Sequence, residues 1–188
     1  RKTGDWMDSR IESLGLIQSA CWRELERASR ERDHEWRVMS MATVGGDGLD
    51  LRSMVVREVR EQENRLTMYT DARSRKVGQI DAQPQAMLLA WSRRMGWQLR
   101  LKVDLSIETA GLAVSSRWAQ LKMTPAAQDY LSPLPPGAPL EGIEPERATR
   151  GHFALIHARV SAMDWLELHP DGRRRAMFDA QGMRWLAP

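Results

Sequence analysis

The amino-acid sequence predicts an α+β fold in which mostly antiparallel strands form a closed or nearly closed barrel. Three features indicate this fold: one long amphipathic segment near the N-terminus, several short apolar segments separated by turn residues, and short helical patterns between them. Closing the strands into a barrel leaves few exposed edges. The chain has 188 residues, an ordinary length for one domain with one core, so we expect a single domain over residues 1–188.

The first predicted element is an N-terminal helix within residues 1–30. Its apolar side chains recur every three or four positions, at Ile11, Leu14, Ile17, Cys21 and Leu25. This is the period of a helix that buries one face.

Three strands of a meander are expected next. The segment 36–44 is rich in apolar and β-branched residues, and the sequence GGDG that follows it supplies glycines for a hairpin turn. The return strand is predicted over residues 49–59. After a charged turn, residues 64–70 alternate as a third strand.

Short helices and strands alternate in the middle of the chain. Residues 74–83 predict a short helix with Ser74 near its N-cap, which ends before Pro84. The apolar run over 85–91 predicts a buried strand. Residues 98–108 alternate apolar and polar side chains, the pattern of a strand with one buried and one solvent-facing side.

The remainder predicts a second helix, a loop and the closing strands. The helix is expected over 113–123, and the segment 132–145 is too rich in proline and glycine for a regular element. Residues 152–168 and 174–188 are predicted to form the closing strands, separated by the turn sequence HPDG.

Composition and charge favour an ordinary globular protein. The net charge is +3 and the pI is near 9.4, but basic and acidic residues are mixed along most of the chain. A nucleic-acid partner is therefore not expected, and it stays open only because of the pI. The longest apolar run, Ala86–Trp91, is much shorter than the ~18 residues of a membrane span, and the first ten residues lack the apolar core of a signal peptide. We expect no membrane partner and a cytoplasmic location.

No metal site or catalytic nucleophile is indicated. The four histidines have no metal-ligand spacing, and no Ser/His/Asp arrangement can be defended. The single cysteine, Cys21, falls on the apolar face of the first helix, so we interpret it as a small buried residue.

The sequence YTDARSRK, Tyr69–Lys76, gathers three cationic side chains and three hydroxyls into eight residues. Anions bind well where the N–H groups of a helix start meet serine hydroxyls and Arg or Lys charges. Ser74, Arg75 and Lys76 stand at such a start, and Arg52 of the preceding strand would reach the same anion if the two strands pair. The alternative is a solvated basic turn without a ligand.

The order of RSMVVR, then LTMYTDARSRKVGQI, then QLRLKV and finally a C-terminal RWLAP resembles the pyridoxamine 5′-phosphate oxidase family, the FMN-binding split β-barrels. The resemblance covers residues 37–188. The loop PLPPGAP and the tryptophan-bearing segment near the C-terminus are more similar to oxidase-related proteins of undetermined substrate. The resemblance implies an FMN-binding split β-barrel with an N-terminal helix and small flanking helices.

The resemblance also implies the cofactor site. Arg52, Arg75 and Lys76 would hold the FMN phosphate, strand residues would run beside the flavin ring, and Gln98 would approach from a later strand. The family is a homodimer whose FMN sites lie at the subunit interface, and Arg175 would be a contact from the partner chain. The implied cofactor-binding residues are Arg52, Ser53, Met54, Val55, Tyr69, Thr70, Ser74, Arg75, Lys76, Gln98 and Arg175.

The positions that bind substrate in the family differ here. A lysine is replaced by Arg57, a tyrosine by Trp118, an arginine by Lys122 and a serine by Ala126, and the Arg-x-His signature near the C-terminus has no histidine. We therefore expect an FMN-dependent oxidoreductase, related to pyridoxamine 5′-phosphate oxidase, that acts on an unidentified small molecule. The alternative is a non-catalytic flavin-binding or flavin-carrier protein. No catalytic residue is assigned.

Overall fold

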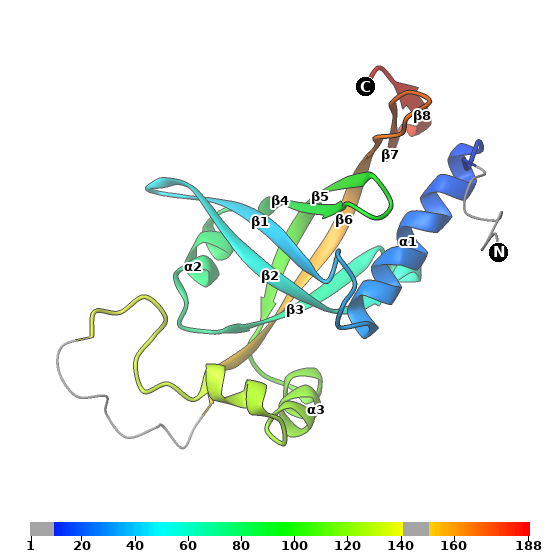
Figure 1. Cartoon of the computed structure of the whole chain (residues 1–188). Coiled ribbons are helices and arrows are strands. Elements are labelled where there is room, and N and C mark those ends of the chain that lie inside the picture. The colour runs from blue at the N-terminus through cyan, green and yellow to red at the C-terminus, as the bar shows by residue number, and fades with distance from the viewer. Residues whose placement is uncertain (1–9, 141–150) are drawn as a thin grey trace.

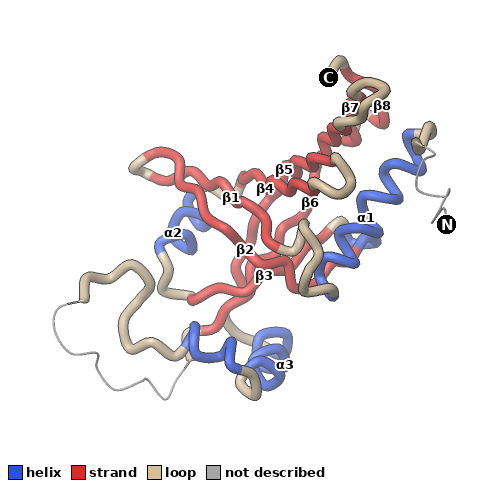
Figure 2. Tube along the Cα trace, in the orientation of Figure 1, coloured by secondary structure: helices blue, strands red, loops and turns tan. Residues whose placement is uncertain are grey.

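The structure is a computed structural model that describes residues 10–140 and 151–188. Its centre is an eight-stranded antiparallel sheet with the order β3-β2-β1-β4-β5-β6-β7-β8. Figures 1 and 2 show the strands wrapping around a common centre. The strands are β1 (Val38–Gly45), β2 (Gly48–Arg60), β3 (Arg65–Asp71), β4 (Gln85–Ser92), β5 (Trp97–Glu108), β6 (Phe153–Glu167), β7 (Arg174–Asp179) and β8 (Gly182–Leu186).

The barrel closes because β3 pairs with both β2 and β6. The first half of β6, Phe153–Arg159, pairs with β3, whereas its second half, Met163–Glu167, pairs with β7. The register of β5 with β6 shifts between Lys102 and Val103, which leaves Ser161 of β6 as the extra residue of a β-bulge at this change of partner. Bulges of this kind bend strands at barrel rims. The strands β7 and β8 therefore extend the sheet away from the closed barrel (Figure 1). The predicted mostly antiparallel α+β barrel is confirmed.

The helix α1 (Leu14–Arg30) packs against the barrel at β2 and contacts β8. Its apolar stripe, which includes Ile17, Cys21 and Leu25, is fully buried. These side chains join the barrel core, where the inward residues of β5 alternate as the sequence predicted. The predicted helix within residues 1–30 is confirmed over 14–30, and residues 1–9 lie outside the described part.

A buried polar pair joins Glu24 of α1 to His34 in the turn before β1. His34 Nε2 lies 2.8 Å from Glu24 Oε2, and His34 Nδ1 accepts a hydrogen bond of 3.1 Å from the Trp36 backbone N–H. Because Nδ1 accepts, Nε2 carries the proton and donates to Glu24. Burial raises the pKa of Glu24, but the hydrogen bonds from His34 and Arg27 outweigh burial and the pKa lies below its ordinary value. This pair ties the helix to the first strand.

Smaller helices cover the other end of the barrel. The helix α2 (Arg75–Ala82) follows β3, and the helix α3 (Leu112–Leu121) leads into the 3-10 helix η2 (Pro125–Tyr130). A short 3-10 turn, η1 (Glu61–Glu63), joins β2 to β3. Figure 1 shows α2 beside the β1–β2 hairpin and α3 at the opposite end of the barrel from β7 and β8. The predicted loop over 132–145 is irregular as far as residue 140, and its remainder lies outside the described residues.

The prediction that residues 85–91 form a buried strand is wrong for one face. Along β4 every second side chain is buried, but Met87, Leu89 and Trp91 are exposed by 40%, 40% and 44%. The run is apolar on both faces, although only one face meets the core of this chain. Within the described residues, no helix is long and apolar enough to span a membrane.

Candidate functional site

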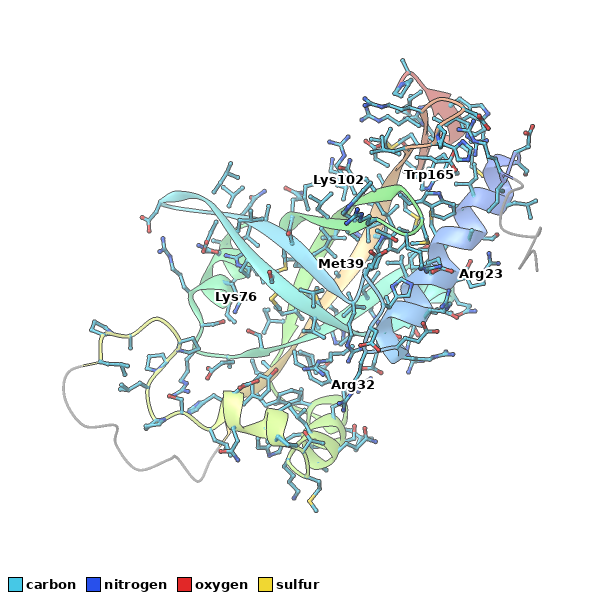
Figure 3. All side chains as sticks on the ribbon, viewed as in Figure 1. Arg23, Arg32, Met39, Lys76, Lys102 and Trp165 are labelled. Atoms are coloured by element: carbon cyan, nitrogen blue, oxygen red, sulfur yellow. The ribbon has the colours of Figure 1, made fainter. Side chains whose placement is uncertain are left out.

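A small polar cradle forms where β3 ends and α2 begins. Thr70 lies near the end of β3 and Ser74 is the N-cap of α2, so the short turn between them brings their hydroxyl oxygens within 3.2 Å. The Lys76 ammonium donates to Thr70 Oγ1 and to Ser74 Oγ, each at 3.2 Å. Both hydroxyl residues are buried. Figure 3 shows Lys76 on the side of the barrel that α2 covers, away from Trp165.

Arg52 approaches the cradle from β2. Its Nη1 donates to Thr43 Oγ1 at 2.5 Å and its Nη2 donates to Gln79 Oε1 at 3.0 Å. The side chain is only 17% exposed. β2 therefore brings a second cation to α2, where it contacts Gln79.

The electrostatics of the cradle are those of an anion site. Burial lowers the pKa of Lys76 below its ordinary value, and the positive charge of Arg52 lowers it further, whereas Asp71 and Asp50 act in the opposite direction. Asp71 is engaged by Arg73, whose Nη2 lies 2.7 Å from Asp71 Oδ2. Within residues 10–140 and 151–188, no carboxylate forms an ion pair with Lys76. An underpaired ammonium, a guanidinium and two hydroxyls fit a phosphate group.

Arg75 lies apart from the cradle. Its guanidinium pairs with Asp47 in the turn between β1 and β2, and the two side chains are 64% and 82% exposed. The structure thus separates Arg75 from Lys76, although the two residues are adjacent in the motif.

The residues implied beside the flavin ring fall on different faces. Ser53 and Val55 point outward from β2, whereas Met54 is 7% exposed and belongs to the core. Tyr69 packs edge-on against Phe153 at a centroid distance of 4.9 Å, and the Arg57 guanidinium lies 5.2 Å from the centroid of the Tyr69 ring. Tyr69 therefore joins a second apolar cluster, next to α3, instead of the barrel core.

Gln98 and Arg175 lie elsewhere on the sheet. Gln98 on β5 stands opposite Trp91 of β4 and Leu166 of β6, and Leu166 stands opposite Arg175 of β7. Arg175 pairs with Asp164 at 2.6 Å. Neither residue has a contact to the cradle within the described chain.

The altered substrate positions are also placed. The Trp118 indole packs on Phe153 at 5.6 Å and against Gly151, where an added Cβ would lie 2.9 Å from the ring. Lys122 is exposed, and Ala126 packs against the second cluster. The indole therefore fills space beside Tyr130, at 6.5 Å between ring centroids.

Three residues that surround Arg52 were not predicted from the sequence, namely Thr43, Asp50 and Gln79. Asp50 Oδ2 lies 2.6 Å from Arg52 Nη2, and Gln79 Nε2 donates to the same Asp50 oxygen at 3.1 Å. Two signals were available. Thr43 is a polar residue in register with buried residues of β1, and Gln79 follows Lys76 by three residues, which places both on one helix face.

No metal centre is found in the described part of the chain, where no group of three or more His, Cys, Asp or Glu side chains could hold an ion. His34 is engaged by Glu24. His157 lies 3.1 Å from Thr67 Oγ1 and 2.7 Å from Glu108 Oε2.

Comparisons with known proteins find matches in sequence and in fold. Residues 19–109 match the family model described as pyridoxamine 5′-phosphate oxidase, FMN-binding domain. A pyridoxamine 5′-phosphate oxidase-related, FMN binding protein from Nostoc punctiforme is 25% identical, covers 94% of this chain and 100% of its own, and superimposes with a TM-score of 0.75. Among the curated proteins, no sequence matches this chain.

Two more distant structures share the fold. PhzG from Burkholderia lata, in complex with tetrahydrophenazine-1-carboxylic acid, is 15% identical, covers 100% of this chain and 98% of its own, and has a TM-score of 0.71. A protein from Clostridium acetobutylicum related to general stress protein 26 is 14% identical, covers 91% and 98%, and has a TM-score of 0.53. Over residues 19–109, and in its split-barrel fold, this chain is therefore similar to the FMN-binding proteins of the pyridoxamine 5′-phosphate oxidase family.

Proposed function

We propose that the chain binds FMN and acts as a flavin-dependent oxidoreductase on a small molecule. The main support for FMN binding is the half-buried Lys76 ammonium group. Among the described residues it has hydroxyl partners but no carboxylate partner, and the charge of Arg52 acts on it. A phosphate bound there would supply the missing negative charge. The family match and the related Nostoc protein support FMN as the ligand.

The cofactor and the protein would make different contributions to the reaction. Bound FMN supplies the redox chemistry by accepting a hydride. The chain would hold the phosphate with Lys76, Arg52 and Ser74, and the extended backbone at Met54 and Val55 would run beside the flavin ring. The residue pattern calls for no side-chain acid or base, so the protein contributes binding, orientation and electrostatics.

We further propose a homodimer that uses the outward face of β1, β2 and β4. This face is unusually apolar for a surface, and exposed apolar patches of this kind mark interaction sites. Its exposed side chains are Val38, Val44, Leu49, Leu51, Met87, Leu89 and Trp91. The partner is taken to be a second copy because the same face continues through Gln98 to Arg175, the residues that a single chain keeps away from its own cradle.

The substrate position is proposed to lie around Arg57. The Arg57 Nε atom is buried without a hydrogen-bond partner, and the side chain lines a cavity of about 370 Å³ together with Arg30 and Arg60. The acidic residue of that lining, Glu58, is already paired with Arg117. Burial, followed by the charges of Arg57 and Arg32, lowers the pKa of nearby Arg37, so positive charge is in excess here. These features favour a substrate that carries an anionic group.

The single cysteine of the sequence, Cys21, is buried and free, which suits a reducing compartment. We therefore keep a cytoplasmic location as a proposal.

An absorption spectrum followed by reduction tests the proposal. The purified protein is expected to carry FMN, and NADPH or another donor is expected to bleach the flavin absorbance repeatedly when oxygen is readmitted. A protein that binds FMN but gives no more turnover than free FMN under the same conditions would instead be a flavin carrier. A protein that binds no flavin would refute both functions.

A further inference from the structure

The phosphate cradle contains its own competing anion. Asp50 Oδ2 lies 2.6 Å from Arg52 Nη2, so a carboxylate already occupies an anion position on this guanidinium. The hydrogen bond from Gln79 lowers the pKa of Asp50, and Arg52 lowers it further, so the carboxylate is ionised at neutral pH. Asp50 also acts electrostatically on Lys76, which joins both cations and the carboxylate into one cluster.

Gln79 fixes the orientation of both groups. Its Oε1 accepts from Arg52 Nη2 at 3.0 Å and from Thr43 Oγ1 at 2.8 Å, while its Nε2 donates to Asp50 at 3.1 Å. The opposite amide orientation would set Nε2 against a guanidinium donor, so the network determines the orientation.

Gly45, at the end of β1, packs closely against the Gln79 side chain and restricts its movement. An added Cβ at Gly45 would lie 2.9 Å from Gln79 Cγ and 3.1 Å from Nε2, so the backbone of the turn packs directly on the amide. The Gln79 residue is 7% exposed. The Asp50 side chain, by contrast, is 37% exposed and has open solvent to swing into.

We propose that Asp50 is an internal counter-ion that leaves Arg52 when a phosphate binds, and that Gln79 is the positioning residue that keeps the Arg52 guanidinium in place during the exchange. This inference rests on the proposed phosphate site. Like charges repel, and a phosphate dianion gains the Arg52 contact only after Asp50 has moved.

The exchange has a consequence for selectivity. A ligand that has only a phosphate must displace Asp50 without further compensation, whereas a flavin phosphate adds contacts through its ring. Asp50 therefore lowers the affinity of the cradle for free phosphate and sulfate. Removing its charge is expected to tighten the binding of every phosphate ligand, which is the reverse of the usual effect of deleting a polar contact.

The experiment compares apo forms of the wild type, Asp50→Asn and Gln79→Met in flavin titrations followed by fluorescence. Asp50→Asn is expected to lower the dissociation constant for FMN by up to about fivefold, the size of one partly exposed charge interaction, and to leave the constant for riboflavin unchanged. Gln79→Met is expected to raise the constant for FMN and not that for riboflavin. Asp81→Asn, which removes the same charge from an exposed position of α2, is the control and is expected to resemble the wild type.

A second measurement uses inorganic phosphate as the ligand and does not depend on flavin binding. Millimolar phosphate is expected to raise the unfolding temperature of Asp50→Asn more than that of the wild type or of Asp81→Asn. If Asp50→Asn binds FMN no more tightly than the wild type and gains nothing from phosphate, the exchange is refuted. If wild type binds no flavin, the proposed function fails while the phosphate arm still decides the role of Asp50.

Discussion

Replacing Lys76 by methionine separates the two roles of its ammonium group. Methionine keeps an unbranched apolar stem and removes the charge. An ammonium has three N–H donors, and two of them are directed at Thr70 Oγ1 and Ser74 Oγ at 3.2 Å, so one remains for a ligand oxygen. A hydrogen bond to a charged group contributes about 1.5–3 kcal/mol, so Lys76→Met is expected to weaken FMN binding by about 10- to 150-fold.

The same substitution is expected to leave the unliganded protein at least as stable as the wild type. The pKa of Lys76 lies below the unfolded value of 10.5, so the folded state binds the proton less tightly than the unfolded state does. Stability therefore rises as pH increases through the window below 10.5, and at neutral pH the charged lysine is a cost. The methionine variant lacks this cost, so its unfolding temperature should equal or exceed that of the wild type, and the difference should shrink at alkaline pH.

The assay pairs fluorescence titration of the apo protein with thermal unfolding of the same samples. Arg23→Met is the matched control because Arg23 is a cation exposed on α1, away from the proposed interface, and lies well away from Lys76 (Figure 3). Riboflavin, which lacks the phosphate, should bind wild type and variant alike. The reasoning fails if Lys76→Met binds FMN as tightly as wild type, or if it loses FMN and riboflavin equally, since the lysine would then not address a phosphate.

The other predictions concern assembly, substrate and acid stability. Leu89 lies at the centre of the outward apolar face, so Leu89→Glu should convert the dimer into monomers, as measured by light scattering, and lower the affinity for FMN. Leu16→Glu, on the exposed side of α1, should do neither, and a Leu89→Glu protein that stays dimeric would show that the interface lies elsewhere. The FMN-loaded protein should not oxidise pyridoxamine 5′-phosphate at a useful rate, because Trp118 and Ala126 supply no hydroxyl to the substrate. Several lost contacts of about 1 kcal/mol or more each amount to a large loss in rate. Ordinary turnover to the aldehyde would show that these residues do not correspond to the substrate positions of the family. The pKa of Glu24 lies below the unfolded value of 4.5, so the ionised Glu24 stabilises the folded protein above that pH, and this contribution is lost as the pH falls through the folded pKa. Glu24→Gln should therefore lose less stability than the wild type between about pH 5 and pH 3. Parallel acid unfolding curves of the two proteins would contradict this.

Local pattern was enough for most elements, because each one leaves a periodic trace. The alternation along β5 and the stripe on α1 both reach the core as predicted. The same reasoning misread β4, where Met87, Leu89 and Trp91 are as apolar as a core but face outward. Periodicity detects apolar faces and cannot say whether the covering surface comes from the same chain.

The candidate site was predictable in part for a similar reason. Ser74 and Lys76 are neighbours in sequence, and a helix start brings them together whatever the rest of the chain does. The position of Arg75 depends on Asp47 in a distant turn, which no local motif reveals. The network of Arg52, Asp50 and Gln79 requires the register of β1 with β2 and the packing of α2 on that hairpin, so it emerges only in three dimensions.

A titration of the wild-type apo protein with FMN and with riboflavin tests the central claim most directly. The cradle of Thr70, Ser74 and Lys76, with Arg52 beside it, predicts that FMN binds at least about tenfold more tightly than riboflavin, since one charge-assisted contact to the phosphate is enough for that ratio. Raising the salt concentration should reduce the preference, because part of it is electrostatic. Equal affinities for the two flavins, or no binding of either, would contradict the assignment of this cradle to a flavin phosphate.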